Sequence, residues 1–220
     1  KSFKQVTLRG LASDGGLYVP QNWQINKKRL SNKSLSFHEV AYEVIKCFIG
    51  SSLSKKRLKE IINKSYKTFR HNEITPITQL DKNNFLLELF HGPTLAFKDI
   101  ALQFLGKTFD DFLENSEKKL CIIGATSGDT GSAAIDAVKK NKFSCIFILH
   151  PYGRVSDFQR RQMTTVKSKN IFNIAVKGTF DDCQNIVKKL FTDKKLNTLV
   201  RLGSINSINW TRIMAQISYY

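Results

Sequence analysis

Between residues 77 and 191, short apolar segments alternate with longer segments in which apolar residues recur at helical spacing. This alternation predicts a parallel sheet with helices on both faces, because parallel neighbours need a crossover connection, usually a helix. The expected strands cover residues 85–90, 120–123, 144–149 and 171–176. The expected helices follow Lys98 and Thr130 and cover residues 155–165 and 180–191. The fold class is therefore α/β.

The two ends of the chain carry different patterns. Residues 1–35 are expected to be irregular or short-strand structure with turns at 13–16, and two amphipathic helices are expected at 37–49 and 54–69, the second behind the cap Ser54. At the other end Trp210, Ile213, Met214 and Ile217 share one helical face with no capping glycine after them. We therefore expect a helical lead-in at 1–75 and a partial α/β domain at 76–220 that stops inside a helix, which leaves the sheet incomplete.

Composition excludes several function classes. Hydrophobic residues make up 41% of the 220 residues, yet no apolar run approaches the roughly 20 residues that cross a bilayer. With no secretory pattern at the amino end, we expect a cytoplasmic protein that does not bind membranes. The four cysteines form no C-x-x-C pair, so we expect reduced thiols and no metal site.

The net charge of +17 raises nucleic-acid binding as a rival function. The lysines and arginines are, however, spread over nearly every expected helix and loop, and they do not form one stripe with interleaved aromatic residues. Solvated helix faces explain this distribution better, so no nucleic-acid partner is expected.

Lys98 is the first candidate for chemistry. It follows the turn at Gly92 and Pro93 and lies between apolar neighbours at the start of an amphipathic segment. Partial desolvation of an ammonium group lowers its pKa and leaves more neutral amine to attack a carbonyl carbon. Lys98 is therefore a candidate nucleophile, against the ordinary alternative of a solvated surface lysine.

A second motif follows the apolar segment 120–123. Residues 124–131 read Gly-Ala-Thr-Ser-Gly-Asp-Thr-Gly and lead into a helix rich in small residues. Glycines let a backbone approach a ligand, and hydroxyl and N–H groups at a helix N-terminus donate to negative charge. The motif lacks the Lys-Ser/Thr pair of a P-loop and the G-x-G-x-x-G spacing of a dinucleotide site. It indicates an anion cradle, with a plain strand-to-helix connection as the alternative.

These two motifs resemble those of the threonine synthase family of pyridoxal-phosphate enzymes. The resemblance extends over nearly the whole chain, through residues 9–10, 13–20, 91–99, 124–131, 150–156, 159–165, 178–184 and 206–210. It implies a tryptophan synthase β-like fold (fold type II), the cofactor pyridoxal 5'-phosphate, and conversion of O-phospho-L-homoserine and water to L-threonine and phosphate. It also implies that the groups holding the cofactor phosphate and pyridine nitrogen lie beyond Tyr220.

The resemblance implies roles for individual residues. Lys98 would carry the cofactor and move protons, and Asp129 would lie near the cofactor's phenolic oxygen, although a helix N-cap is the alternative for Asp129. The substrate carboxylate would be bound by Thr126, Ser127, Gly128 and Thr130. The substrate phosphate is expected at Asn206, Ser207 and Arg212, where polar donors precede a helix, with a helix cap plus a surface arginine as the alternative.

Two other functions stay open at this point. One is a related amino-acid dehydratase or β-replacement synthase, which would use the same lysine and cradle without a second phosphate site. The other is a threonine synthase-like protein that binds cofactor or phosphate without turnover. Oligomeric state does not follow from these patterns.

Overall fold

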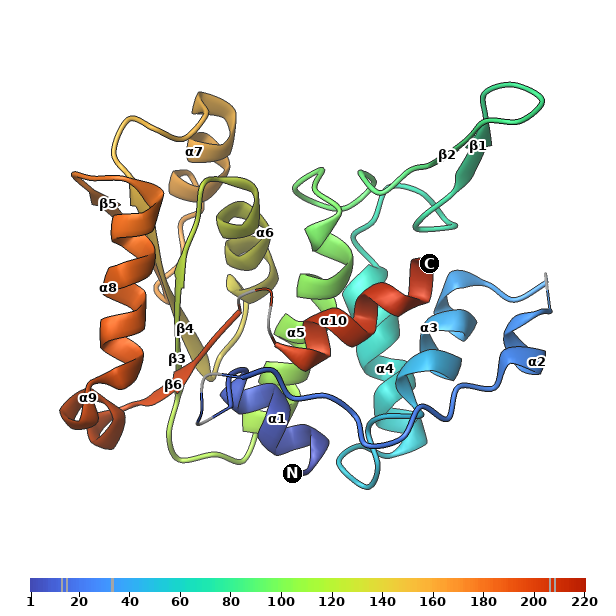
Figure 1. The fold of residues 1–220 in the computed structure, drawn as a ribbon, viewed down its shortest axis with the longest axis horizontal. Helices are drawn as coiled ribbons and strands as arrows, with labels where there is room; N and C mark the ends of the chain where they lie inside the picture. The colour runs from blue at the N-terminus through green and yellow to red at the C-terminus, as the bar shows by residue number, and fades with distance from the viewer. Residues whose placement is uncertain (13, 15, 33, 206, 208) are drawn as a thin grey trace.

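The chain was analysed as a computed structural model that describes residues 1–12, 14, 16–32, 34–205, 207 and 209–220. Its main sheet has four parallel strands in the order β5-β4-β3-β6. These are β3 (Leu120–Ala125), β4 (Ser144–Pro151), β5 (Ile171–Val176) and β6 (Arg201–Gly203). Helices cover both faces, as Figure 1 shows, so the predicted α/β class is confirmed.

Alternation along β3 divides the side chains between the two faces of the sheet. Ile122 packs with α5 (Lys98–Leu113) and α6 (Asp129–Val138), whereas the next residue, Ile123, packs on the other face with Cys183 of α8 (Phe180–Thr192). Successive side chains of a strand point to opposite faces, and both faces are buried in a parallel sheet. This explains why β3 is a nearly continuous apolar run.

Two further helices complete the sheet region. Helix α7 (Asp157–Thr164) packs against α6, and α9 (Lys194–Leu199) follows α8 and leads into β6. In the part of the chain that the structure describes, no helix is long and apolar enough to cross a membrane.

The expectation of irregular or short-strand structure at 1–35 was wrong for two short helices, whereas residues 10–12 and 16–26 form no helix or strand. The structure has α1 (Phe3–Arg9) and α2 (Lys27–Leu30) there, followed by α3 (Phe37–Ile45) and α4 (Lys55–Tyr66). In α1 the Ser2 side chain accepts from the Gln5 N–H while the Gln5 side chain accepts from Ser2, a capping box. This Ser-x-x-Gln pattern was the local signal for α1. Ser13 and Gly15 of the expected turn lie outside the described residues.

The segment 85–90 was also predicted wrongly as a strand of the main sheet. Only β2 (Phe85–Leu87) is a strand, and it pairs antiparallel with β1 (Ile77–Gln79) in a separate hairpin. Phe85 is 61% exposed, so this apolar run does not belong to a buried sheet. Figure 1 shows the hairpin projecting away from the main sheet.

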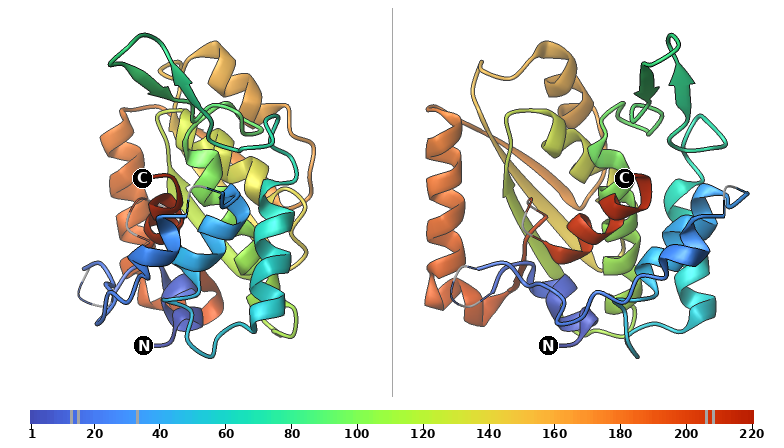
Figure 2. Two further views of the ribbon diagram at one scale, coloured as in Figure 1. Left: turned by 90° about the vertical axis from the view of Figure 1, so that its right-hand side faces the viewer. Right: turned by 45° about the vertical axis from the view of Figure 1, so that its right-hand side comes forward.

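Helix α10 (Trp210–Gln216) and the 3-10 turn η1 (Ile217–Tyr219) end the described chain. Helix α10 packs against α5, which lies between the sheet and the helices α3 and α4 in the right-hand view of Figure 2. Phe104 of α5 belongs to the core with α3 and α4, whereas Leu105 belongs to the core with the sheet. Helix α5 thus connects the two cores, and a domain boundary at 75 stays a prediction.

Candidate active site

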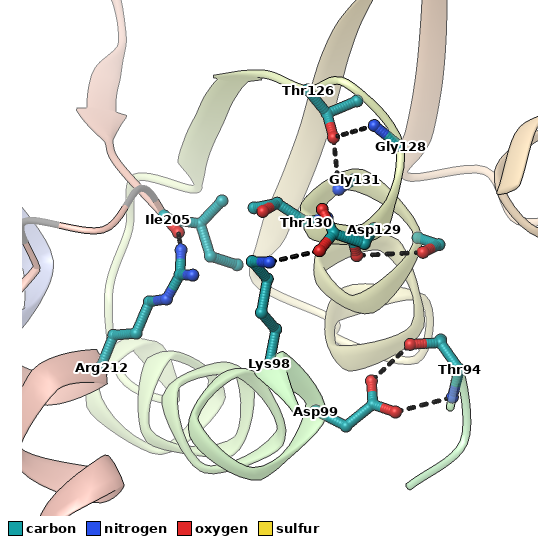
Figure 3. Close-up of polar contacts among 11 residues, drawn as sticks. Thr94, Lys98, Asp99, Thr126, Gly128, Asp129, Thr130, Gly131, Ile205 and Arg212 are labelled. Carbon is teal, nitrogen blue, oxygen red and sulfur yellow. Dashed lines mark hydrogen bonds and ion pairs between the residues drawn. The ribbon is translucent and has the colours of Figure 1, made fainter. Parts of the chain in front are cut away.

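Lys98 is the first residue of α5, and its ammonium group points toward the N-terminus of α6. Its side chain is 15% exposed, and its Nζ forms an ion pair with Oδ2 of Asp129 (Figure 3). Nζ also lies 4.4 Å from the ring centroid of Phe97, a cation–π distance. The structure therefore holds this lysine largely buried, with one aromatic and one anionic partner.

The turn before Lys98 is fixed by the next residue, Asp99. Its fully buried carboxylate accepts a hydrogen bond from the Thr94 N–H at 2.7 Å and another from the Thr94 hydroxyl at 2.6 Å. Burial raises the pKa of Asp99 to about 6, although the two bonds from Thr94 act in the opposite direction. A Cβ on Gly92 would lie 2.5 Å from the Asp99 side chain, so only glycine fits there. The sequence patterns did not identify Asp99 as a residue that positions the site. Its place directly after Lys98 was the sequence feature that could have indicated it.

The loop between β3 and α6 folds around the hydroxyl of Thr126. Thr126 Oγ1 accepts hydrogen bonds from the N–H groups of Gly128, at 2.9 Å, and Gly131, at 2.8 Å. Thr126 is only 1% exposed, so its side chain braces the loop from within. The N–H groups of Ser127 and Asp129 have no acceptor among the described residues. Two free donors at the N-terminus of α6 suit an anion.

Asp129 begins α6, and its N-cap is Gly128, so the alternative role of Asp129 as the N-cap was wrong. Its Oδ1 accepts from the Thr130 N–H at 2.8 Å, which leaves Oδ2 for Lys98. Partial burial raises the pKa of Asp129, but the hydrogen bond and charge of Lys98 outweigh that effect and lower the pKa overall. The carboxyl is therefore ionised at neutral pH, and the α6 N-terminus also favours its negative charge.

Arg212 is buried on α10 without an acidic partner in contact. It is 3% exposed, and the one hydrogen bond of its side chain within the described residues runs from Nη1 to the Ile205 carbonyl oxygen at 3.1 Å. Burial lowers the pKa of Arg212, and the charge of Asp129 opposes this. A guanidinium group has five donors, and a buried cation without paired acceptors is costly. The free donors of Arg212 therefore indicate a site for an external anion.

The structure brings several predicted residues together. Thr130, Ser207 and Arg212 line one cavity of about 290 Å³ between the end of β3 and α8. Figure 3 places Lys98 between Arg212 and Asp129. Asn206 lies outside the described residues. Within the described chain no group of three or more His, Cys, Asp or Glu side chains could hold a metal ion.

Comparison with known proteins agrees with this geometry. Residues 1–66 match the family model "Threonine synthase N terminus". The chain is 49% identical to the threonine synthase of Pseudomonas aeruginosa over 221 aligned positions, which cover 100% of the chain and 47% of that protein. Among solved structures, the pyridoxal-phosphate-bound threonine synthase of Brucella melitensis has a TM-score of 0.90 and 44% identity, covering 100% of this chain and 48% of that one. The yeast threonine synthase has a TM-score of 0.91 and 46% identity, covering 100% and 46%.

The fold and the site together define the tryptophan synthase β-like class, in which a lysine at a helix N-terminus faces an anion cradle at the carboxyl end of a parallel strand. Within that class the chain is homologous over its whole length to threonine synthases, and its first 66 residues match the family model for the threonine synthase N terminus. It spans about half the length of the relatives that it matches, and it corresponds to their N-terminal half.

Proposed function

We propose that this chain is the lysine-bearing half of a threonine synthase, a pyridoxal-phosphate-dependent carbon–oxygen lyase that converts O-phospho-L-homoserine and water to L-threonine and phosphate. The observation that carries the proposal is the pair of anion-binding features around one lysine. The α6 N-terminus offers free N–H donors, and buried Arg212 offers a guanidinium group without a contacting acid. The substrate has two matching anions, a carboxylate and a phosphate.

The residues present fit the cofactor. Lys98 has a largely buried amine at a helix N-terminus, the type of amine that takes an aldehyde, and Asp129 holds it toward the cradle. Lys98 would carry pyridoxal phosphate, with Asp129 beside its phenolic oxygen. When bound, the cofactor supplies the electron sink for carbanion character at the substrate carbons. The groups that hold its phosphate and pyridine nitrogen would lie beyond Tyr220.

Other residues of this chain would bind the substrate, and Lys98 would transfer protons. The N–H groups of the α6 N-terminus and the Thr130 hydroxyl would bind the substrate carboxylate, and Ser207 and Arg212 would bind its phosphate. Lys98 would move protons at Cα and Cβ, because its amine faces the cradle and can both accept and donate a proton. Phosphate leaves from Cγ, and water adds at Cβ.

The test is phosphate release from O-phospho-L-homoserine by the full-length protein, with Lys98→Ala and the matched control Lys107→Ala from the same helix. We expect Lys98→Ala to lose turnover and Lys107→Ala to keep it, since Lys107 lies at a different cavity beside Asp110. Borohydride reduction of the loaded protein should fix the cofactor on the peptide that bears Lys98. A label on another lysine would refute the assignment.

The same assay separates the two other functions. Ammonia and keto-acid formation from serine or threonine, without phosphate release, would identify a dehydratase. Bound cofactor with no turnover of any of the three amino acids would identify a noncatalytic binding protein. Arg212 favours the phosphate substrate, because a dehydratase substrate carries only one anion.

A further inference from the structure

Two cysteines lie side by side at the end of the sheet opposite the candidate active site. Cys121 of β3 and Cys145 of β4 are direct register partners in the parallel pair, and both are free and half-buried. Cys121 packs with the cluster on the α8 face, and in-register residues of parallel strands project to the same face. Thr126 lies five residues further along the chain, roughly 16 Å away at strand spacing. The thiols are therefore separate from the site of Lys98.

The backbone spacing permits a bond between the two sulfurs. Neighbouring strands lie about 4.8 Å apart. This separation falls within the roughly 4.4–6.8 Å range of Cα separations seen in disulfides. The register and the strand spacing therefore place the two Cα atoms within bridging distance.

A half-open cavity of about 360 Å³ exposes both thiols. Its apolar lining comes from Phe147, Leu199 and Val200, and Lys118, Lys119 and Arg201 line its remaining walls. The cavity lies where β3 and β4 begin, near α9 at the lower left of Figure 1. Three cationic side chains around two thiols favour an anionic reagent.

The two thiols differ in acidity. The interaction with Cys121 and the charge of Lys119 lower the pKa of Cys145 to about 7, against an opposing effect of burial. The interaction with Cys145, together with burial, raises the pKa of Cys121. Cys145 is therefore the more acidic thiol, about half ionised at pH 7, whereas Cys121 stays protonated. Burial raises the pKa of Cys47 and of Cys183, which makes them unreactive controls.

We propose that Cys121 and Cys145 form a dithiol modification site that exchanges with anionic low-molecular-weight disulfides of the oxidised-glutathione class and closes to a disulfide between β3 and β4. The Cys145 thiolate attacks one sulfur of the reagent, forms a mixed disulfide and releases one glutathione thiolate. The Cys121 thiol then loses its proton and attacks the Cys145 sulfur, which releases the second glutathione. The protein dithiol is oxidised by two electrons, and the reagent is reduced to two thiols.

The first test is exchange of the full-length protein with oxidised glutathione at pH 7, followed by peptide mapping. We expect a peptide pair joined through Cys121 and Cys145, with the loss of two hydrogen atoms. Cys121→Ser should accumulate the glutathione adduct on Cys145, Cys145→Ser should form neither product, and Cys47→Ser should behave as wild type. A Cys121→Ser protein that gains no adduct, or a disulfide that joins other cysteines, would overturn the proposal.

The second test measures rates. At pH 7 a thiol of pKa about 7 is half ionised, whereas an ordinary thiol of pKa about 8.5 is roughly 3% ionised. The more acidic thiolate is, however, about fivefold less nucleophilic, which cancels part of the advantage in thiolate concentration. Cys145 should therefore react with a neutral disulfide about threefold faster than an ordinary exposed thiol, and faster still than Cys47. Oxidised glutathione should react about tenfold faster than neutral hydroxyethyl disulfide, and this preference should disappear in about 1 M salt or in the variant with Lys118→Ala and Lys119→Ala. Equal rates for the two reagents at low salt would refute the anionic selectivity.

Discussion

The loop that cradles the proposed carboxylate depends on one hydroxyl oxygen, and Thr126→Val removes that oxygen with little change of shape. Two buried N–H groups, those of Gly128 and Gly131, then lose their acceptor. Each buried donor left unsatisfied costs about 1–3 kcal/mol, so the free energy of unfolding should fall by about 2–6 kcal/mol.

The assay is equilibrium unfolding of the full-length apoprotein in urea, since bound cofactor would shift the midpoint by mass action. With a slope of about 2–3 kcal/mol/M, the midpoint should move down by about 1–3 M. Thr126→Ser keeps the oxygen and should cost about 1 kcal/mol for the lost methyl group. Ser127→Ala changes an exposed side chain and should stay within about 0.5 kcal/mol of wild type. A Thr126→Val protein as stable as Ser127→Ala would refute the reasoning, because the loop would then hold its shape without the hydroxyl.

Three further predictions follow from the same geometry. Arg212→Ala should lower kcat/KM for O-phospho-L-homoserine by about 10–150-fold, because it removes one charge-assisted hydrogen bond of about 1.5–3 kcal/mol. Cofactor affinity should change little. Unchanged kinetics and unchanged inhibition by phosphate would place the phosphate site elsewhere, with Arg160 and Arg161 as the next candidates. The folded pKa of Asp99 is about 6 against 3.8, so its contribution to stability is complete below pH 3.8 and is lost as pH rises through about 6. Wild type should therefore lose about 3 kcal/mol of unfolding free energy across that window relative to Asp99→Asn, and parallel pH curves for the two proteins would contradict this. A Cβ on Gly131 would lie 2.5 Å from Thr126 Cγ2 and 2.6 Å from Met163 Sδ, so Gly131→Ala should lower the free energy of unfolding in urea by about 1–3 kcal/mol. The control Gly124→Ala should cost less, because its Cβ would have its nearest neighbour at 3.5 Å. Equal costs for the two variants would show that the loop relaxes.

Several elements could be predicted from local patterns because their signals are local. The apolar run of β3, the glycines of the following loop and the small residues that open α6 lie within 19 consecutive residues, Leu120–Val138. Ser54 caps α4 as expected, since its hydroxyl accepts from the Arg57 N–H three residues later. Helix α1 carried an equally local signal, the capping box of Ser2 and Gln5, which the short length of the helix obscured.

The hairpin shows what local patterns leave open. Residues 85–90 have the apolar content of a buried strand, yet β2 pairs only with β1, and Phe85 is exposed in the described structure. Periodicity reports that a segment suits a strand, but not which strand it pairs with, because pairing is decided by residues distant in sequence.

The candidate site divides in the same way. The sequence by itself determined which residues can do the chemistry: a lysine behind a Gly-Pro turn, a loop of small and hydroxylated residues at a helix N-terminus, and an arginine one turn inside the last helix. Only the tertiary structure decided that Asp129, 31 residues away, is the partner of Lys98, that Thr126 faces inward, and that Arg212 is buried without an acid in contact. The reason is that hydrogen-bonded turns and caps are set within a few residues, whereas the burial and pairing of a charge depend on how α5, α6 and α10 pack together.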